Sequence, residues 1–313
     1  MMLTPRVIAM QQYFLPLYED LLWCIVRNGS CILQTQLCRL LFRDRRDYKL
    51  STDLVRDLVD ARILSKQKLG EHNLLVVTSC TLKYFGIVNQ PHLNAYRIKL
   101  SALIFEKYLT QGYWKYDNPA KALRQRMERT SALSCYAIGE VHALQLERLL
   151  PAFEAHGFFT DGMRYQIERA RLRMECAKKK QSFEAARERD LYGLACSGIY
   201  ITGVAIRPDE YGNKRPVALV DVYLVNRWSV PQLVFNLIDA KRVIESTLQN
   251  DAVALFTIHS HDRADPDFMK KTWEGLARYR EFLLPEDAER AVAFRYYDTR
   301  AALFSSIDPD NLV

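Results

Sequence analysis

Apolar positions in the first 90 residues repeat at helical spacing three times and then change to the composition of short strands. Each helical stretch presents one apolar face and one polar face, the pattern of a helix packed on a core. Gly29 ends the first stretch, and Gly70 sits in the middle of a polar turn typical of a hairpin. The predicted elements are helices over 13–27, 35–42 and 51–62, strands over 63–64 and 74–78, and a closing segment over 81–85. Ser51 is the expected N-cap of the third helix.

The pattern beyond residue 90 has two further parts. Residues 94–187 are mostly helical in pattern, with Asn94 and Asn118 as expected N-caps, the second followed by Pro119. From residue 199, apolar strands alternate with helices, which predicts a sheet with helices packed on it. The predicted strands are 199–206, 217–225, 252–258 and 291–297, and the predicted helices between them are 231–248 and 266–284.

These patterns predict an α+β multidomain protein. The expected domains are an N-terminal one over residues 1–90, a helical connecting region over 91–190 and an α/β domain over 191–313. No membrane span and no signal peptide are recognisable, and the seven cysteines include no Cys-x-x-Cys pair. A cytoplasmic location without membrane association is therefore expected.

Charge is distributed unevenly along the 313 residues, whose formal net charge is +7. The net charge is +4 over residues 1–90, +6 over 91–190 and −3 over 191–313. A basic body favours a polyanionic partner. The predicted helix over 164–189 mixes both signs, however, which is also typical of a solvated helix face.

The N-terminal pattern resembles a known DNA-binding module. Residues 54–66, followed by residues 74–86, are similar to the third helix, wing and closing helix of winged helix-turn-helix regulators. The resemblance implies double-stranded DNA as the partner, with a homodimer as a further option. In such proteins the third helix enters the major groove and the wing contacts the neighbouring backbone.

Candidate DNA-binding side chains follow from that arrangement. They are Arg43, Arg45, Arg46 and Lys49 for phosphates, Ser51, Thr52 and Arg56 for base edges, and Lys66 and Lys68 on the wing. The same helix also carries Asp53, Asp57 and Asp60, and acid near the tip repels phosphate. The alternative is a winged helix used as a protein-interaction module.

The C-terminal pattern resembles that of restriction-endonuclease-like domains. Pro208-Asp209 follows a strand, and Asp221 comes 12 residues after Asp209 in the next strand. In that family two carboxylates hold Mg²⁺ and a lysine activates water. Tyr223 stands where the lysine is expected, and Lys241 is the one candidate to replace it. An inactive endonuclease-like domain, a Mg²⁺-dependent nuclease and an unrelated α/β domain all stay open.

A second cluster follows the strand over 252–258. His259 and His261 could face one metal ion, whereas Asp265 before Pro266 could simply cap the next helix. No phosphate-binding loop, dinucleotide fingerprint or nucleophile elbow is present, so no cofactor is expected. Whether the protein is an enzyme is left open, with a non-catalytic C-terminal domain preferred.

Three segments together resemble the replication-relaxation type proteins of bacterial plasmids and other mobile elements. They are the wing region 54–86, the arginine-rich helix 124–129 and the strand block 200–225. The resemblance implies a DNA-binding regulator, or an accessory of replication or transfer of the element, with no established enzyme activity.

Overall fold

The computed structural model divides the chain into two compact units. Unit 1 comprises residues 1–128 and 299–313, and unit 2 comprises residues 129–298. The predicted connecting region 91–190 is therefore shared between the two. The structure describes residues 4–42, 48–70, 72–87, 93–110, 116–129, 139–179, 181–183, 190–208, 214–225, 228–248, 253–260, 265–279 and 290–297.

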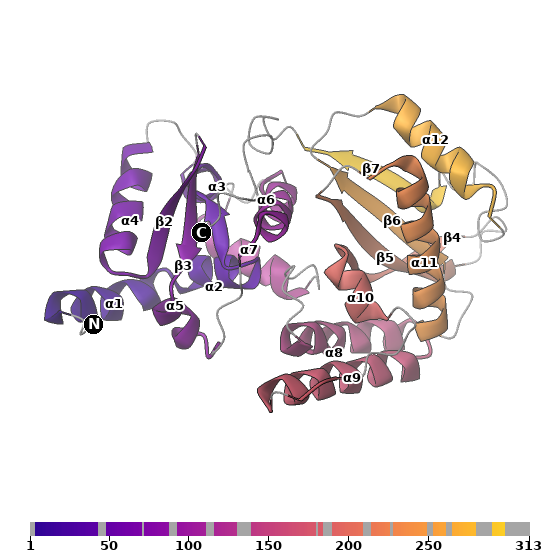
Figure 1. The fold of residues 1–313 in the computed structure, drawn as a ribbon, viewed down its shortest axis with the longest axis horizontal. Coiled ribbons are helices and arrows are strands. Elements are labelled where there is room, and N and C mark those ends of the chain that lie inside the picture. Colours follow the sequence, from indigo (N-terminus) through magenta and orange to yellow (C-terminus); the bar gives the residue numbers. More distant parts are fainter. Residues whose placement is uncertain are drawn as a thin grey trace. The chain divides into compact units, whose positions relative to one another are not determined.

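The described residues form twelve helices and two sheets (Figure 1), which confirms a mixed α+β protein. No helix among them is long and apolar enough to cross a membrane. The elements of unit 1 are α1 (Pro5–Leu17), α2 (Glu19–Arg27), β1 (Cys31–Leu33), α3 (Gln34–Leu41), α4 (Tyr48–Asp60), β2 (Leu64–Leu69), β3 (His72–Val77), α5 (Ser79–Tyr84), α6 (Ala95–Leu109) and α7 (Pro119–Arg129).

The sheet of unit 1 is antiparallel, in the order β1-β3-β2. Gly70 turns the chain between β2 and β3 with φ of 53°, a conformation that glycine adopts without a steric penalty. Two elements differ from the sequence prediction. Tyr18 leaves the helical conformation just after Pro16, so the single helix predicted over 13–27 is two helices. Strand β1 was not predicted, because three residues are too few to show alternation.

Helix α6 packs against the N-terminal core of unit 1 through polar as well as apolar contacts. Ser101 donates to the carbonyls of Asn28 (2.5 Å) and Cys31 (2.9 Å), and Asn28 Nδ2 donates to the carbonyl of Ser101 (3.1 Å). The buried carboxylate of Glu106 accepts from Arg39 Nη1 at 2.8 and 2.9 Å. These contacts make α6 an integral part of unit 1.

Unit 2 is a mixed four-stranded sheet with helices packed on one face. The sheet order is β4-β5-β6-β7, with β4 antiparallel to β5 and with β5, β6 and β7 parallel. In Figure 1, α11 lies across the strands, and α12 joins the same apolar cluster through Leu276. The elements are α8 (Gly139–Ala155), α9 (Asp161–Lys178), α10 (Leu191–Cys196), β4 (Ile199–Pro208), β5 (Lys214–Leu224), α11 (Val230–Leu248), β6 (Val253–Ser260), α12 (Pro266–Leu276) and β7 (Val292–Tyr296).

The core of unit 2 takes alternate residues of each strand. Val220 and Val222 of β5 join Phe256 and Ile258 of β6 in one apolar cluster with the helices. The residues between them, including Asp221, point to the opposite face because side chains alternate along a strand. The caps predicted at three other helices are confirmed: Asn94 accepts from Arg97 N, Asn118 from Lys121 N and Asp265 from Asp267 N.

Candidate functional sites

Buried polar side chains gather on the sheet face of unit 2 that points away from the helical layer. Asp221 and Tyr223 are two residues apart on β5, and His259 is the register partner of Tyr223 on β6. Tyr297 follows the last residue of β7. All four side chains therefore lie near the carboxyl ends of parallel strands, where sites of α/β sheets often form. None of these residues is more than 9% exposed.

The four side chains form a continuous hydrogen-bonded chain. His259 Nε2 lies 3.0 Å from Asp221 Oδ1, and His259 Nδ1 lies 2.7 Å from the Tyr297 hydroxyl. The Tyr223 hydroxyl donates to the other carboxylate oxygen of Asp221 at 3.2 Å. The His259 ring is also nearly parallel to two tyrosine rings, with centroid distances of 4.8 Å to Tyr223 and 5.7 Å to Tyr297.

The protonation of this chain follows from its surroundings. Burial, and next the nearby charge of Asp221, raises the pKa of Tyr297 well above its ordinary value. Tyr297 therefore keeps its proton, and its hydroxyl can donate to His259 Nδ1 in the tautomer that leaves this nitrogen without a hydrogen. The ring then carries its own proton on Nε2, facing the carboxylate. Both nitrogens of His259 are thus engaged, and binding a metal ion would break one of these hydrogen bonds.

Of the two carboxylates of the predicted endonuclease-like site, the structure describes Asp221. Asp209 lies outside the described residues, but its neighbour Pro208 pairs with Lys214 at the hairpin end. Asp221 pairs with Tyr200, seven residues further along β5. At about 3.3 Å per residue, Lys214 and Asp221 are about 23 Å apart along β5.

Two further candidates of unit 2 are Lys241 and His261. Lys241 belongs to α11, which covers the sheet face opposite Asp221, and it pairs with Glu245. His261 lies outside the described residues. Where the chain is described, no group of three His, Cys, Asp or Glu residues is arranged to hold a metal ion.

Helix α4 of unit 1 presents most of its predicted DNA-binding residues to solvent. Lys49, Thr52 and Arg56 are exposed, at the spacing of one helix face. Ser51 is buried and accepts a hydrogen bond from the Cys38 thiol at 2.9 Å, so it is not placed to read a base edge. The predicted N-cap at Ser51 is also wrong, because α4 begins at Tyr48. Arg43, Arg45 and Arg46 lie outside the described residues.

The acidic residues of α4 lie beside its basic ones. Arg56 Nη2 is 3.0 Å from Asp53 Oδ1, and Arg56 Nε is 3.9 Å from Asp57 Oδ1. Asp60 is exposed at the end of the same helix. The five charged side chains Lys49, Asp53, Arg56, Asp57 and Asp60 sum to −1, so α4 alone offers no net attraction to phosphate.

The β2–β3 hairpin supplies the positive charge that α4 lacks. Lys66, Gln67 and Lys68 are consecutive exposed residues in the middle of β2. Their strand is held by Leu64 and Leu69, whose buried side chains anchor its two ends. The lysines therefore stand on a strand fixed to the core rather than on a loose loop.

The arginines of other helices mostly hold their own unit together. Arg124 on α7 contacts Glu19 at 3.1 Å and Asp20 at 3.0 Å on α2, and its guanidinium lies 5.2 Å from the centre of the Trp23 ring. On α9, both Arg169 and Arg173 contact the buried carboxylate of Asp190, at 3.2 and 2.8 Å. The composition of these helices is compatible with a basic surface, because composition alone does not reveal that their arginines form ion pairs with distant residues.

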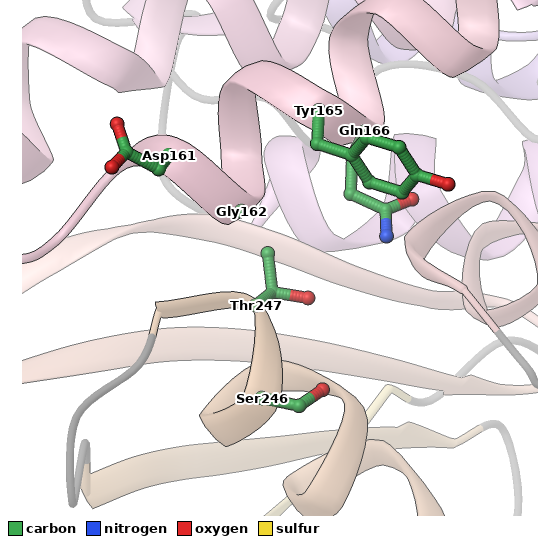
Figure 2. A pocket seen from close by; sticks show the side chains of 6 residues that line it. All are labelled: Asp161, Gly162, Tyr165, Gln166, Ser246 and Thr247. Carbon is green, nitrogen blue, oxygen red and sulfur yellow. The ribbon is translucent and has the colours of Figure 1, made fainter.

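A shallow hollow of about 310 Å³ lies where α9 begins beside the end of α11 (Figure 2). Gly162 approaches α11 so closely that a Cβ there would stand 1.9 Å from the carbonyl oxygen of Thr247. The hydroxyls of Ser246 and Thr247 donate to the same carbonyl, that of Val243. The hollow is thus explained by helix packing. Its lining residues are Asp161, Gly162, Tyr165, Gln166, Ser246 and Thr247.

Comparison of the sequence with protein-family models and with curated proteins, and of the fold with solved structures, found no match. The functional argument therefore rests on the geometry of the two units.

Proposed function

We propose that unit 1 is a winged helix that binds double-stranded DNA. The element order of α2, β1, α3, α4, β2 and β3, with the sheet order β1-β3-β2, supports the fold assignment. The observation that carries the function is the exposed lysine pair Lys66 and Lys68 on a core-anchored hairpin that directly follows α4. In this assignment α4 lies in the major groove and the hairpin contacts phosphates.

The same proposal gives unit 2 a non-catalytic role. Both oxygens of the Asp221 carboxylate and both nitrogens of His259 are engaged by side chains of the protein itself, which argues against their holding a metal ion. The protein then acts as a regulator, or as an accessory in replication or transfer of a mobile element, while unit 2 serves binding or assembly.

A salt titration of duplex DNA binding tests the proposal. The wild-type protein should bind a fluorescent duplex with an affinity that falls steeply with salt, and should leave the DNA intact with Mg²⁺ present. Each lysine–phosphate contact contributes about 0.9 to the slope of log affinity against log salt. The double variant Lys66→Glu/Lys68→Glu should therefore lower affinity on all sequences and reduce the slope by about 2.

The matched control carries the same charge change in unit 2. Lys270→Glu/Lys271→Glu alters two lysines of α12, which we expect to leave the slope unchanged. Duplex binding that is equal in the wild type and in the hairpin variant would contradict the proposed interface. Absence of duplex binding in the wild type would instead favour the protein-interaction alternative, and Mg²⁺-dependent cleavage would overturn the non-catalytic role of unit 2.

A further inference from the structure

An ion pair on the exposed face of α4 has the geometry of a positioned base-reading side chain. Arg56 is 63% exposed and is held by Asp53 one turn earlier, at 3.0 Å between Nη2 and Oδ1. Asp57 lies beside it, 3.9 Å from Nε. A guanidinium has five N–H donors, so these contacts leave it able to bind a further acceptor pair.

The acidic residues on this face of α4 are unfavourable for binding DNA. If α4 enters the major groove, Asp53 and Asp57 repel the phosphates on either side and weaken binding to every sequence. Exposed ion pairs of this kind contribute little to stability, so helix stability is a weak reason for them. Restricting the motion of Arg56 before binding, by contrast, reduces the entropy lost when it docks on a base.

We infer that Arg56 reads a guanine in the major groove and that Asp53 positions it, so that the DNA partner is a duplex containing a G·C pair at a defined place. Arginine bonds guanine O6 and N7 through two parallel hydrogen bonds, the commonest specific contact in the major groove. This inference rests on the proposed function of unit 1. Affinity comes from the hairpin lysines and sequence preference comes from α4.

Three variants on α4 separate these roles. Arg56→Lys keeps the charge and removes the two-pronged donor geometry. Asp53→Asn removes the carboxylate that holds Arg56 and keeps the side-chain size. Asp60→Asn makes the same charge change on an exposed residue four positions after Arg56, so it is the matched control for the electrostatic effect.

Selection of bound sites from randomised duplexes, followed by affinity measurements on single-base variants of the selected site, provides the test. The wild type should prefer G·C at one position by roughly 5- to 150-fold over the other pairs. Arg56→Lys should lose that preference while its affinity for unrelated duplex stays the same. Asp53→Asn should weaken the preference and strengthen binding to unrelated duplex, whereas Asp60→Asn should only strengthen binding.

The outcomes distinguish the base-reading role of Arg56 from DNA binding by unit 1 itself. Duplex binding with no sequence preference, or with a preference that Arg56→Lys leaves intact, would overturn the reading role and leave DNA binding standing. Equal behaviour of Asp53→Asn and Asp60→Asn would overturn the positioning role of Asp53. A wild type that binds no duplex would remove the proposed function and this inference together.

Discussion

Two sets of buried polar side chains, one in each unit, are satisfied in different ways. In unit 1, Asn28 and Ser101 bond to backbone carbonyls, and Gln11 Nε2 likewise donates to the carbonyl of Ala61 at 2.8 Å. In unit 2, the buried ionisable groups Asp221 and His259 bond to each other and to two tyrosines. The first arrangement uses partners that do not titrate, and the second uses partners that do.

This difference should appear as different responses to mutation and to pH. A side chain bonded to a carbonyl loses one or two neutral hydrogen bonds when it is truncated, each of modest net value. A buried carboxylate that loses its partner keeps a charge in a poorly solvating place, which costs more. The comparison therefore predicts a larger loss of stability when a member of the Asp221–His259 chain is removed than when Asn28 or Ser101 loses its hydrogen bonds, and only the first loss should depend on pH.

The largest effect is expected for His259→Ala. Removing the imidazole leaves Asp221 with only the Tyr223 hydroxyl among the partners described above, and it opens a gap beside the Tyr223 ring. The free energy of unfolding of unit 2 should fall by about 3 kcal/mol. Hydrogen exchange of peptides covering β5 and β6 measures this loss, since those amides should lose protection while peptides from α4 and β3 should not.

His156→Ala is the matched control for that experiment, because this half-buried histidine of the same unit contacts a single carbonyl, that of Ala152. Tyr223→Phe is a milder variant if His259→Ala fails to fold, and loss of the hydrogen bond to Asp221 should cost about 1 kcal/mol. Equal effects of His156→Ala and His259→Ala would contradict the importance given to the hydrogen-bonded chain.

A smaller effect is expected for Ser101→Ala in unit 1. The hydroxyl bonds two buried carbonyls, those of Asn28 and Cys31, and the substitution leaves almost no cavity. The free energy of unfolding should fall by about 1–2 kcal/mol. Urea unfolding should give the same difference in free energy between the wild type and Ser101→Ala at pH 6 and at pH 9, because neither a hydroxyl nor a carbonyl titrates in this range. Ser79→Ala, at an exposed position, is the control and should leave the free energy of unfolding unchanged. A difference that varies with pH would contradict the comparison.

The sequence predicted the local elements well because their signals are local. Apolar residues at positions 54, 55 and 58 indicated the buried face of α4, and the apolar run around Val220 indicated β5. The same periodicity assigns Ser51 to the buried face of α4, three positions before Leu54, but its resemblance to a helix cap concealed this. Caps and base-contacting positions use the same residue types, so residue type alone does not separate them.

The hydrogen-bonded chain of unit 2 could not be predicted in the same way. Asp221 and His259 are 38 positions apart, and they meet only because β5 and β6 pair in one particular parallel register. Nothing local encodes that register. The sequence did single out both residues, but it assigned them to two separate sites, Asp221 with Asp209 and His259 with His261. The charge pairs of Arg124 and Arg173 were missed for the same reason, since composition does not reveal partners distant in sequence.

The smallest effect, and the most specific to the comparison, concerns Tyr297 at alkaline pH. The pKa of this residue is raised in the folded protein by burial and by Asp221, whereas an unfolded tyrosine titrates near 10. A raised pKa stabilises the folded state fully below pH 10, and this contribution is lost as pH rises above 10, because the unfolded chain then gives up its proton first. The urea midpoint of unit 2 should therefore fall between pH 9 and pH 11. Tyr297→Phe should lower the midpoint at pH 8 but flatten its dependence on pH, while Tyr165→Phe, at an exposed position, should reproduce the wild-type curve. If the urea midpoint of Tyr297→Phe falls with pH as steeply as that of the wild type, another titrating group of unit 2 is responsible for the loss of stability at alkaline pH.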